Sequence, residues 1–220
     1  MTGREQVWGV VVAAGSGSRF GGPKHEVRLD GRALWEWARD ALLESGVHRV
    51  VVVGRVPGGV EGGPARHVSV ARGLAAVGEE ATVIAVHDAA RPLAPAAMMV
   101  RMYETLREGP WDGVIPVVPF PDSIKRVRTD DGRVVATLSR GEVLGAQTPQ
   151  VFRAPVLRRA HAAPVTAGSV GPAPDDAAMV EAIGGRVVSV AGDRAAMKIT
   201  YPEDLVVARA LLRRRAGRGR

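Results

Sequence analysis

The chain of 220 residues uses arginine almost everywhere for its basic side chains, so its few lysines stand out. Of the 30 basic residues, only Lys24, Lys125 and Lys198 are lysines. A lysine ammonium is a compact charge, whereas an arginine guanidinium is a planar fork, so the two bind anions differently. Lys24 ends a glycine-rich stretch, residues 13–24, with the sequence AAGSGSRFGGPK. This stretch carries the strongest sign of chemistry in the sequence.

The glycine-rich stretch has the composition of a loop that holds phosphate groups. Gly15 and Gly17 let the backbone turn with its N–H groups exposed, and such groups form a cradle for phosphate oxygens. Arg19 and Lys24 add two cations beyond the cradle. These features favour a polyphosphate ligand. The alternative is a turn that only links a strand to a helix.

Two widespread phosphate loops do not fit this stretch. A P-loop needs G-x-x-x-x-G-K-[ST], and Pro23 stands where its lysine belongs. A dinucleotide-binding loop needs G-x-G-x-x-G, whereas Gly15, Gly17 and Gly21 leave one residue too many between the last two glycines. A short-chain reductase would also need Tyr-x-x-x-Lys, and neither tyrosine is followed by a lysine at that spacing.

A third loop, that of the nucleotidyltransferases, reads L-A-A-G-x-G-x-R followed by P-K. Residues 13–19, AAGSGSR, and residues 21–24, GGPK, match it closely. The chain thus resembles the 2-C-methyl-D-erythritol 4-phosphate cytidylyltransferases, a family of sugar-phosphate nucleotidyltransferases. From Val7 to about Leu212, further segments resemble the family in the same order: VHDAARP at 86–92, DSIKR at 122–126, LGAQTPQVF at 144–152 and AMKITYPEDL at 196–205.

The resemblance implies a reaction, a cofactor and a set of site residues. The reaction is transfer of CMP from CTP to 2-C-methyl-D-erythritol 4-phosphate with release of pyrophosphate, a step in non-mevalonate isoprenoid biosynthesis, with Mg²⁺ bridging phosphate oxygens. No protein ligands for the metal are assigned. The implied residues are the catalytic cations Arg19, Lys24 and Lys198; the nucleotide-binding residues Ala13, Ala14, Gly15, Ser16, Gly17, Gly63 and Ser69; and the substrate-binding residues Asp88, Arg91, Ser123 and Arg140.

Asp88 and Arg91 also have an interpretation from residue type and position alone. Asp88 follows an apolar run and is expected at the end of a strand, beside the glycine-rich loop. A carboxylate there can bind a sugar hydroxyl or help to hold a metal, and Arg91 can pair with a substrate phosphate. The alternative is that Asp88 caps the next helix and pairs with Arg91.

Apolar runs and helical patterns alternate along the chain, which predicts an α/β fold. Continuous valine-rich runs are typical of parallel strands covered on both faces. We expect strands at 7–13, 48–54, 82–87, 112–118 and 185–190, and helices at 33–46, 69–78, 95–109, 175–185 and 201–215. Lys198 is expected at the end of a further short strand. This order predicts a Rossmann-like, mostly parallel twisted sheet flanked by helices.

Residues 120–140 break this pattern with two short polar strands joined by Asp-Asp-Gly, which indicates a β-hairpin. The hairpin has no core of its own, so we expect an arm at about 120–145 that lies on the domain or reaches a partner. The resemblance implies a homodimer in which this arm covers the partner's site. Ser123 and Arg140 would then grip the second substrate's phosphate in the other subunit.

The chain departs from the family pattern in both recognition regions. Pro64 stands where the family usually has an acidic residue after a glycine pair, and Pro174 replaces a threonine before Asp175. These changes put cytosine selectivity and the acceptor in question. A cytidylyltransferase for another polyol phosphate or phosphonate, such as ribitol 5-phosphate, and a catalytically silent nucleotide-binding protein stay open as alternatives.

Charge and composition narrow the classes of protein further. Most of the net charge of +7 lies in RRRAGRGR at 213–220, and without it the chain has 25 basic against 23 acidic residues. With aromatic residues at 4%, little is available to stack on bases, so we expect no nucleic-acid partner. The absence of cysteine excludes disulfides, thiolate metal sites and a cysteine nucleophile. We expect one cytoplasmic domain over 1–212 without a membrane segment, and a disordered tail at 213–220.

Overall fold

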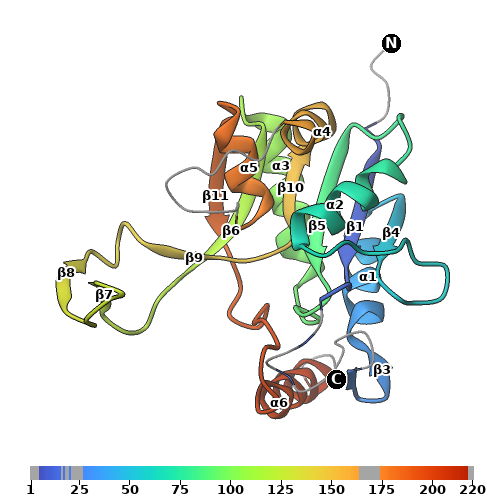
Figure 1. Cartoon of the computed structure of the whole chain (residues 1–220). Helices are drawn as coiled ribbons and strands as arrows, with labels where there is room; N and C mark the ends of the chain where they lie inside the picture. The colour runs from blue at the N-terminus through green and yellow to red at the C-terminus, as the bar shows by residue number, and fades with distance from the viewer. Residues whose placement is uncertain (1–4, 16, 18–19, 21–26, 164–173, 218–220) are drawn as a thin grey trace.

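The computed structural model describes residues 5–15, 17, 20, 27–163 and 174–217. Within them lies a seven-stranded sheet with the order β11–β6–β10–β5–β1–β4, and β9 pairs with β6 outside that path (Figure 1). Its strands are β1 (Val7–Val12), β4 (Arg49–Val53), β5 (Val83–Asp88), β6 (Gly113–Pro119), β9 (Leu144–Ala146), β10 (Gln150–Arg153) and β11 (Val187–Ala191). β1, β4, β5, β6 and β11 are parallel, while β9 and β10 are antiparallel to their neighbours. The predicted fold class is confirmed.

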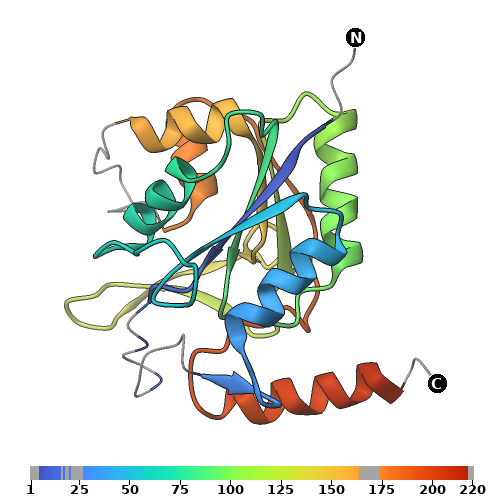
Figure 2. The same cartoon turned by 90° about the vertical axis from the view of Figure 1, so that its right-hand side faces the viewer.

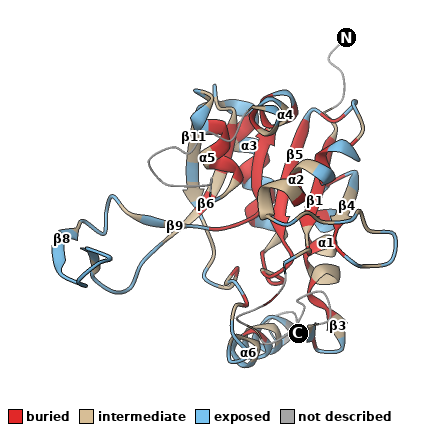
Figure 3. Cartoon of the chain, viewed as in Figure 1, coloured by how far each residue is buried: buried red, intermediate tan, exposed pale blue. Residues whose placement is uncertain are grey.

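The valine-rich runs form the parallel strands at nearly the predicted positions. β1 and β5 are buried along almost their whole length and pair in register, with Val10 beside Val86. Figure 3 shows this buried centre of the sheet in red. β10 is missing from the sequence prediction. It has only four residues, and it inserts between β5 and β6 with Val151 and Phe152 fully buried.

Helices cover both faces of the sheet and give each face its own apolar core (Figure 2). One face carries α1 (Leu34–Glu44) and α3 (Ala96–Glu108), and the other carries α2 (Arg66–Ala75), α4 (Ala154–Ala162) and α5 (Asp176–Ala182). The predicted helices are present, although α2 begins earlier than expected and α4 was not predicted. No helix among the described residues is long and apolar enough to cross a bilayer.

A smaller apolar cluster lies below the sheet, where α6 (Asp204–Gly217) packs near the short ribbon of β2 (Arg28–Leu29) and β3 (Arg32–Ala33). The prediction of a disordered tail from residue 213 is wrong for 213–217, because α6 continues to Gly217. Arginines favour a helix and are stabilised in its last turn by the helix dipole. The Arg215 guanidinium also donates to the Leu93 carbonyl oxygen at 2.6 Å. Residues 218–220 lie outside the described part of the chain.

The predicted arm is present and extends away from the sheet (Figure 1). It is a separate ribbon of β7 (Ile124–Val127) and β8 (Val134–Leu138), and β9 returns the chain to β6. Gly132, in the predicted Asp-Asp-Gly turn, has φ +72°, a conformation that glycine adopts without strain. The arm is mostly exposed, including the apolar side chains of Val127, Val134 and Val135 (Figure 3).

Candidate active site

A pocket of about 520 Å³ opens at the carboxyl ends of β1 and β5. Open α/β sheets bind ligands at this edge. Asp88 and Lys198 line the pocket. So does every predicted nucleotide-binding residue that the structure describes, namely Ala13, Ala14, Gly15, Gly17, Gly63 and Ser69. Ser16, Arg19 and Lys24 lie outside the described residues. Segments that are far apart in the sequence thus meet at one cavity.

Two glycines shape the loops on one side of this pocket. Gly17 has φ +65°, which favours glycine. Gly62, in the loop before α2, packs closely against Ala14 of the glycine-rich loop. A Cβ added to Gly62 would lie 2.1 Å from the Ala14 Cβ. Within the part of the chain that the structure describes, the N–H groups of Ala14, Gly15 and Gly17 donate to no protein acceptor. Backbone amides in such a loop can bind an anion.

Ser69 fixes the second loop from inside helix α2. Its side chain is almost fully buried, and its hydroxyl oxygen accepts a hydrogen bond from the Gly63 N–H at 3.0 Å. The hydroxyl also lies 3.1 Å from the Ala65 carbonyl oxygen, to which it donates. Ser69 therefore holds the backbone of Gly63 at the pocket wall.

Asp88 lies at the end of β5, where two cations share its carboxylate. The Lys198 ammonium donates to Oδ2 at 2.7 Å, and the Arg66 guanidinium donates through Nε to Oδ1 at 3.1 Å. Burial alone would raise the pKa of Asp88, but Arg66 and Lys198 outweigh it and hold that pKa well below its usual range. Asp88 is therefore ionised at neutral pH.

Lys198 reaches Asp88 from the connection between β11 and α6. The prediction that Lys198 ends a short strand is wrong, because residues 197–200 have no regular secondary structure. The connection is held in place by a backbone hydrogen bond from the Ile199 N–H to the Ala90 carbonyl oxygen at 2.8 Å. The Lys198 side chain is 40% exposed, so its ammonium can meet a ligand as well as Asp88.

Arg66 is a pocket residue that the sequence prediction missed. It is the first residue of α2, and its guanidinium bridges Asp88 and Asp176, with Nη1 2.8 Å from Asp176 Oδ2. Burial alone would lower the pKa of Arg66, but the two carboxylates raise it above its ordinary value. A cation in the first turn of a helix opposes the helix dipole. An arginine at this unfavourable position of a predicted helix could have indicated that acidic side chains elsewhere in the fold pair with it.

The comparison with known proteins identifies the family. The model of the 2-C-methyl-D-erythritol 4-phosphate cytidylyltransferase family matches residues 7–214. The chain belongs to this family.

Individual cytidylyltransferases of the family match almost the whole chain. The enzyme of that name from Rhodococcus jostii (strain RHA1) is 45% identical over 226 aligned positions, with 96% of each chain covered. The one from Rubrobacter xylanophilus is 40% identical with the same coverage. The crystal structure of the cytidylyltransferase from Thermus thermophilus matches with a TM-score of 0.74 and 32% identity, over 93% of this chain and 98% of that one.

Arg91 lies beside a second cavity rather than on the cytidylyltransferase pocket described above. This cavity of about 490 Å³ is also lined by Phe120, Arg194 and Met197. The Arg91 guanidinium donates to the Ala196 and Ala146 carbonyl oxygens at 2.8 and 3.3 Å, while its Nε is buried and has no partner among the described residues. Burial lowers the pKa of Arg91. The hydrogen-bond partners of the Asp88 carboxylate are Arg66 and Lys198, so the alternative of an Asp88–Arg91 pair is not the observed arrangement.

Thr148 is a second residue that the prediction did not single out. Its hydroxyl oxygen accepts a hydrogen bond from the Asp88 N–H at 3.0 Å and lies 3.0 Å from His87 Nδ1. Because the Thr148 oxygen accepts from Asp88, its own hydrogen is free to be donated to His87. Burial lowers the pKa of His87 to about 4. Thr148 thus holds the backbone of Asp88 from the segment just before β10.

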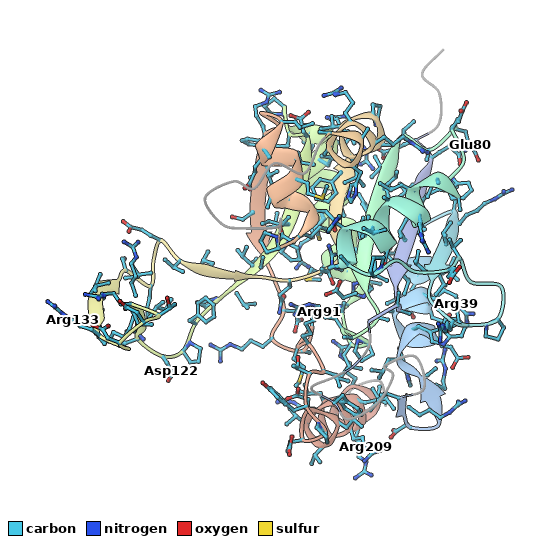
Figure 4. The ribbon with its side chains drawn as sticks, in the orientation of Figure 1. Arg39, Glu80, Arg91, Asp122, Arg133 and Arg209 are labelled. Carbon is cyan, nitrogen blue, oxygen red and sulfur yellow. The ribbon has the colours of Figure 1, made fainter. Side chains whose placement is uncertain are left out.

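The predicted arm residues do not join the pocket of their own chain. Ser123 and Arg140 lie on the exposed arm, and the Arg140 guanidinium donates to the Pro121 carbonyl oxygen at 3.1 Å. Figure 4 shows Asp122 and Arg133 on the arm, well separated from Arg91 at the lower edge of the sheet. Ser123 and Arg140 are therefore not part of the lining of either cavity in this chain.

The charged groups of the pocket fit a metal ion that is held mainly by the phosphates of a bound nucleotide rather than by protein side chains. No cluster of three or more His, Asp or Glu side chains that could hold a metal is present among the described residues. Among the described residues that line the pocket, the carboxylate is that of Asp88, and both of its oxygens are already bonded to cations. Mg²⁺ commonly binds through substrate phosphates, water and one or two carboxylates. A Mg²⁺–triphosphate complex suits such a site better than a free ion.

Proposed function

We propose that this protein transfers CMP from CTP to 2-C-methyl-D-erythritol 4-phosphate and releases pyrophosphate. An oxygen of the acceptor phosphate attacks the α-phosphorus of CTP in line. A new P–O bond forms, and the bond from the α-phosphorus to the oxygen that bridges to the β-phosphate breaks. The observation that carries the proposal is that one pocket joins the glycine-rich loop to the Asp88–Lys198 pair.

The nucleotide is proposed to lie along the wall formed by the two loops. The amides of Ala14, Gly15 and Gly17 donate to no acceptor among the described residues, and backbone amides of this kind suit phosphate oxygens. The backbone of Gly63, fixed by Ser69, offers hydrogen-bonding groups at the other end of the wall, where the nucleoside would lie. Backbone groups at a fixed position can select a base without a charged side chain.

Catalysis in this proposal consists of positioning and charge neutralisation. The acceptor phosphate is already ionised at neutral pH, so no strong general base is required. Lys198, Arg19 and Lys24 would stabilise the negative charge that gathers on the α-phosphate and the departing pyrophosphate. Such a group is typically worth ~10² to 10³ in rate. Asp88 would hold the Lys198 ammonium in place through their 2.7 Å contact.

Mg²⁺ is proposed as the cofactor, held by the phosphate oxygens of CTP. When bound, it supplies positive charge that neutralises the triphosphate. Asp88 contributes by keeping Lys198 and Arg66 next to the same phosphates.

The acceptor is proposed to bind between Asp88, Arg91 and the arm of a second subunit. Arg91 has a buried Nε without a partner among the described residues, and it faces a cavity beside the base of the arm. The arm exposes Phe120, Val127 and Val134, which a partner subunit would cover. A homodimer would also bring Ser123 and Arg140 of the partner subunit to the acceptor phosphate.

A second candidate function is transfer of CMP to another polyol phosphate or phosphonate. Pro64 lines the pocket where the family usually has an acidic residue. Because proline offers no side-chain hydrogen bond, recognition there is looser. The phosphate-binding loop is common to both candidates, so only the acceptor distinguishes them.

Pyrophosphate release tests the proposal. The protein is incubated with Mg²⁺, CTP and, in turn, 2-C-methyl-D-erythritol 4-phosphate, ribitol 5-phosphate and other polyol phosphates, and the CDP-polyol is identified by mass. We expect turnover with 2-C-methyl-D-erythritol 4-phosphate and CTP, and much less with ATP, GTP or UTP. Turnover only with a different acceptor would establish the second candidate, and no pyrophosphate with any acceptor would indicate a silent nucleotide-binding protein.

A further inference from the structure

Asp176 is a fully buried carboxylate that does not line the pocket, yet it is bonded to a residue that does. It is the first residue of α5, and its Oδ2 accepts a hydrogen bond from Arg66 Nη1 at 2.8 Å. Its Oδ1 lies 3.0 Å from Nε2 of His161, on α4. A carboxylate accepts hydrogen bonds only, so His161 donates from Nε2. Both oxygens of Asp176 are therefore fixed in direction.

Arg66 carries this constraint to the pocket. Its guanidinium is a rigid plane, and it donates through Nη1 to Asp176 and through Nε to Asp88. The plane cannot turn without lengthening one of these two bonds. The third nitrogen, Nη2, is buried and has no partner among the described residues. Asp176 thus sets the direction from which Arg66 meets Asp88.

Asp88 in turn divides its carboxylate between Arg66 and Lys198, one oxygen to each. If Arg66 lost Asp176, its guanidinium would be free to turn and take both oxygens of Asp88, because a bidentate pair is the stronger arrangement. The Lys198 ammonium would then lose its fixed partner. The four charged groups alternate in sign along this path, from Asp176 to Arg66, Asp88 and Lys198.

We propose that Asp176, oriented by His161, is a positioning residue that acts on the Lys198 ammonium through Arg66 and Asp88. The role of Lys198 in turnover comes from the proposed function, and the effect on turnover rests on it. The geometric part, in which a buried carboxylate controls a lysine at the pocket, stands without any substrate.

The scarcity of lysine allows this geometric part to be measured directly. Protein labelled with ¹³C and ¹⁵N in lysine gives side-chain signals from only Lys24, Lys125 and Lys198, and Lys198→Arg assigns the last of these. In Asp176→Asn we expect the Lys198 signals to move, while those of Lys125 stay in place. The matched control is the neighbouring change Asp175→Asn. Asparagine can keep the cap on the Ala178 N–H at 3.0 Å, but it loses the bond that Asp175 Oδ2 accepts from Gln150 Nε2 at 2.8 Å. The control thus removes one carboxylate oxygen beside Asp176 without touching Arg66. Lys198 signals that move no more in Asp176→Asn than in Asp175→Asn would overturn the proposal.

Turnover gives the second measurement, at a temperature where circular dichroism shows each variant fully folded. In Asp176→Asn we expect kcat to fall about 10- to 100-fold, because a small displacement of a catalytic group costs this much, with little change in the KM for CTP. Asp175→Asn should keep the wild-type kcat. A wild-type kcat in Asp176→Asn would overturn the proposal. If the wild-type protein is itself inactive, the proposed function fails, and the lysine signals still decide the geometric part.

A double-mutant cycle separates positioning from general damage to the fold. If Asp176 acts through Arg66, Asp176→Asn should lower kcat by less than about threefold when added to Arg66→Gln. Two losses that multiply would mean that Asp176 acts independently of Arg66, against the proposal. Should Asp176→Asn fail to fold, Arg66→Lys removes the planar fork but keeps the charge. It should then shift the Lys198 signals and lower kcat, and no effect of Arg66→Lys on either would count against the proposal.

Discussion

Asp88 and Lys198 are 110 residues apart in the sequence, yet the Lys198 ammonium lies 2.7 Å from the Asp88 carboxylate, and both residues line the pocket. Asp88 ends a strand of the sheet, and Lys198 lies in the connection to the last helix. This pair connects the carboxyl edge of the sheet with the C-terminal part of the chain. It gives the pocket a fixed cation beside the amides of the glycine-rich loop.

Removing the Lys198 ammonium should almost abolish turnover. In Lys198→Ala we expect kcat to fall about 10² to 10³-fold, because a cation at the reacting phosphates is lost. The KM for CTP should change less. Lys125→Ala is the matched control, since Lys125 lies on the exposed arm and bonds Thr137 Oγ1 at 2.8 Å. Retention of more than about a tenth of wild-type kcat in Lys198→Ala would contradict the role of Lys198.

Removing the Ser69 hydroxyl should weaken CTP binding more than turnover. In Ser69→Ala the Gly63 N–H loses its partner at the pocket wall. We expect the KM for CTP to rise about tenfold, as for one lost hydrogen bond, with kcat nearly unchanged. Ser45→Ala is the control, because Ser45 is also a buried serine but bonds Leu42 and Tyr103 away from the pocket. An unchanged KM in Ser69→Ala would argue against a nucleotide at this wall.

Two inactive variants should restore activity to each other if the arm works across a dimer. Arg140→Ala removes a guanidinium from the arm, and Lys198→Ala removes the ammonium from the pocket. In a mixed dimer one of the two sites is free of both changes, so full exchange of subunits should restore about one quarter of wild-type sites. The measurement is turnover after mixing, with each variant alone as control. No recovery after subunit exchange, or full wild-type activity in a monomer by sedimentation, would refute the arm's role in the second site.

Acid should destabilise the fold through His87. Burial lowers the pKa of His87 to about 4 in the folded protein, whereas an exposed histidine in the unfolded chain titrates near 6.5. Below about pH 6.5 the unfolded state therefore binds a proton that the folded state does not, and the free energy of unfolding falls as pH falls. The expected loss is about 3 kcal/mol by pH 4.

Urea unfolding at several pH values measures this contribution. His87→Gln keeps a group that can bond the Thr148 hydroxyl but does not titrate, so its stability should fall less steeply between about pH 6.5 and pH 4. Equal slopes for the wild type and His87→Gln would show that His87 does not titrate as its burial requires.

Local patterns allowed most of the fold to be predicted, and the misses have a common cause. The strands around Val10 and Val86 and the arm's turn at Gly132 are encoded by neighbouring residues, through apolar runs and a turn signal. β10 has only four residues and owes its place to strands distant in sequence, so no local period reveals it. The helix α4 begins directly after β10, with Ala154, and its pattern was hidden by the same short segment.

The residues of the site that belong to recognisable sequence motifs could be predicted, and those outside the motifs could not. The glycine-rich loop and Asp88 follow strands that were predicted, so their meeting at one sheet edge could be expected. Arg66 was missed because its role depends on two carboxylates, Asp88 and Asp176, that only the fold brings to it. Thr148 was missed for the same reason, since its hydroxyl acts on the backbone of a strand 60 residues away.

A crystal structure with a non-hydrolysable CTP analogue and Mg²⁺ tests the central claim most directly. The account predicts the triphosphate in the pocket at the carboxyl ends of β1 and β5, with its oxygens on the amides of Ala14, Gly15 and Gly17. Its α-phosphate should lie within reach of the Lys198 ammonium. Phosphates bound elsewhere, or a Lys198 ammonium turned away from them, would contradict it.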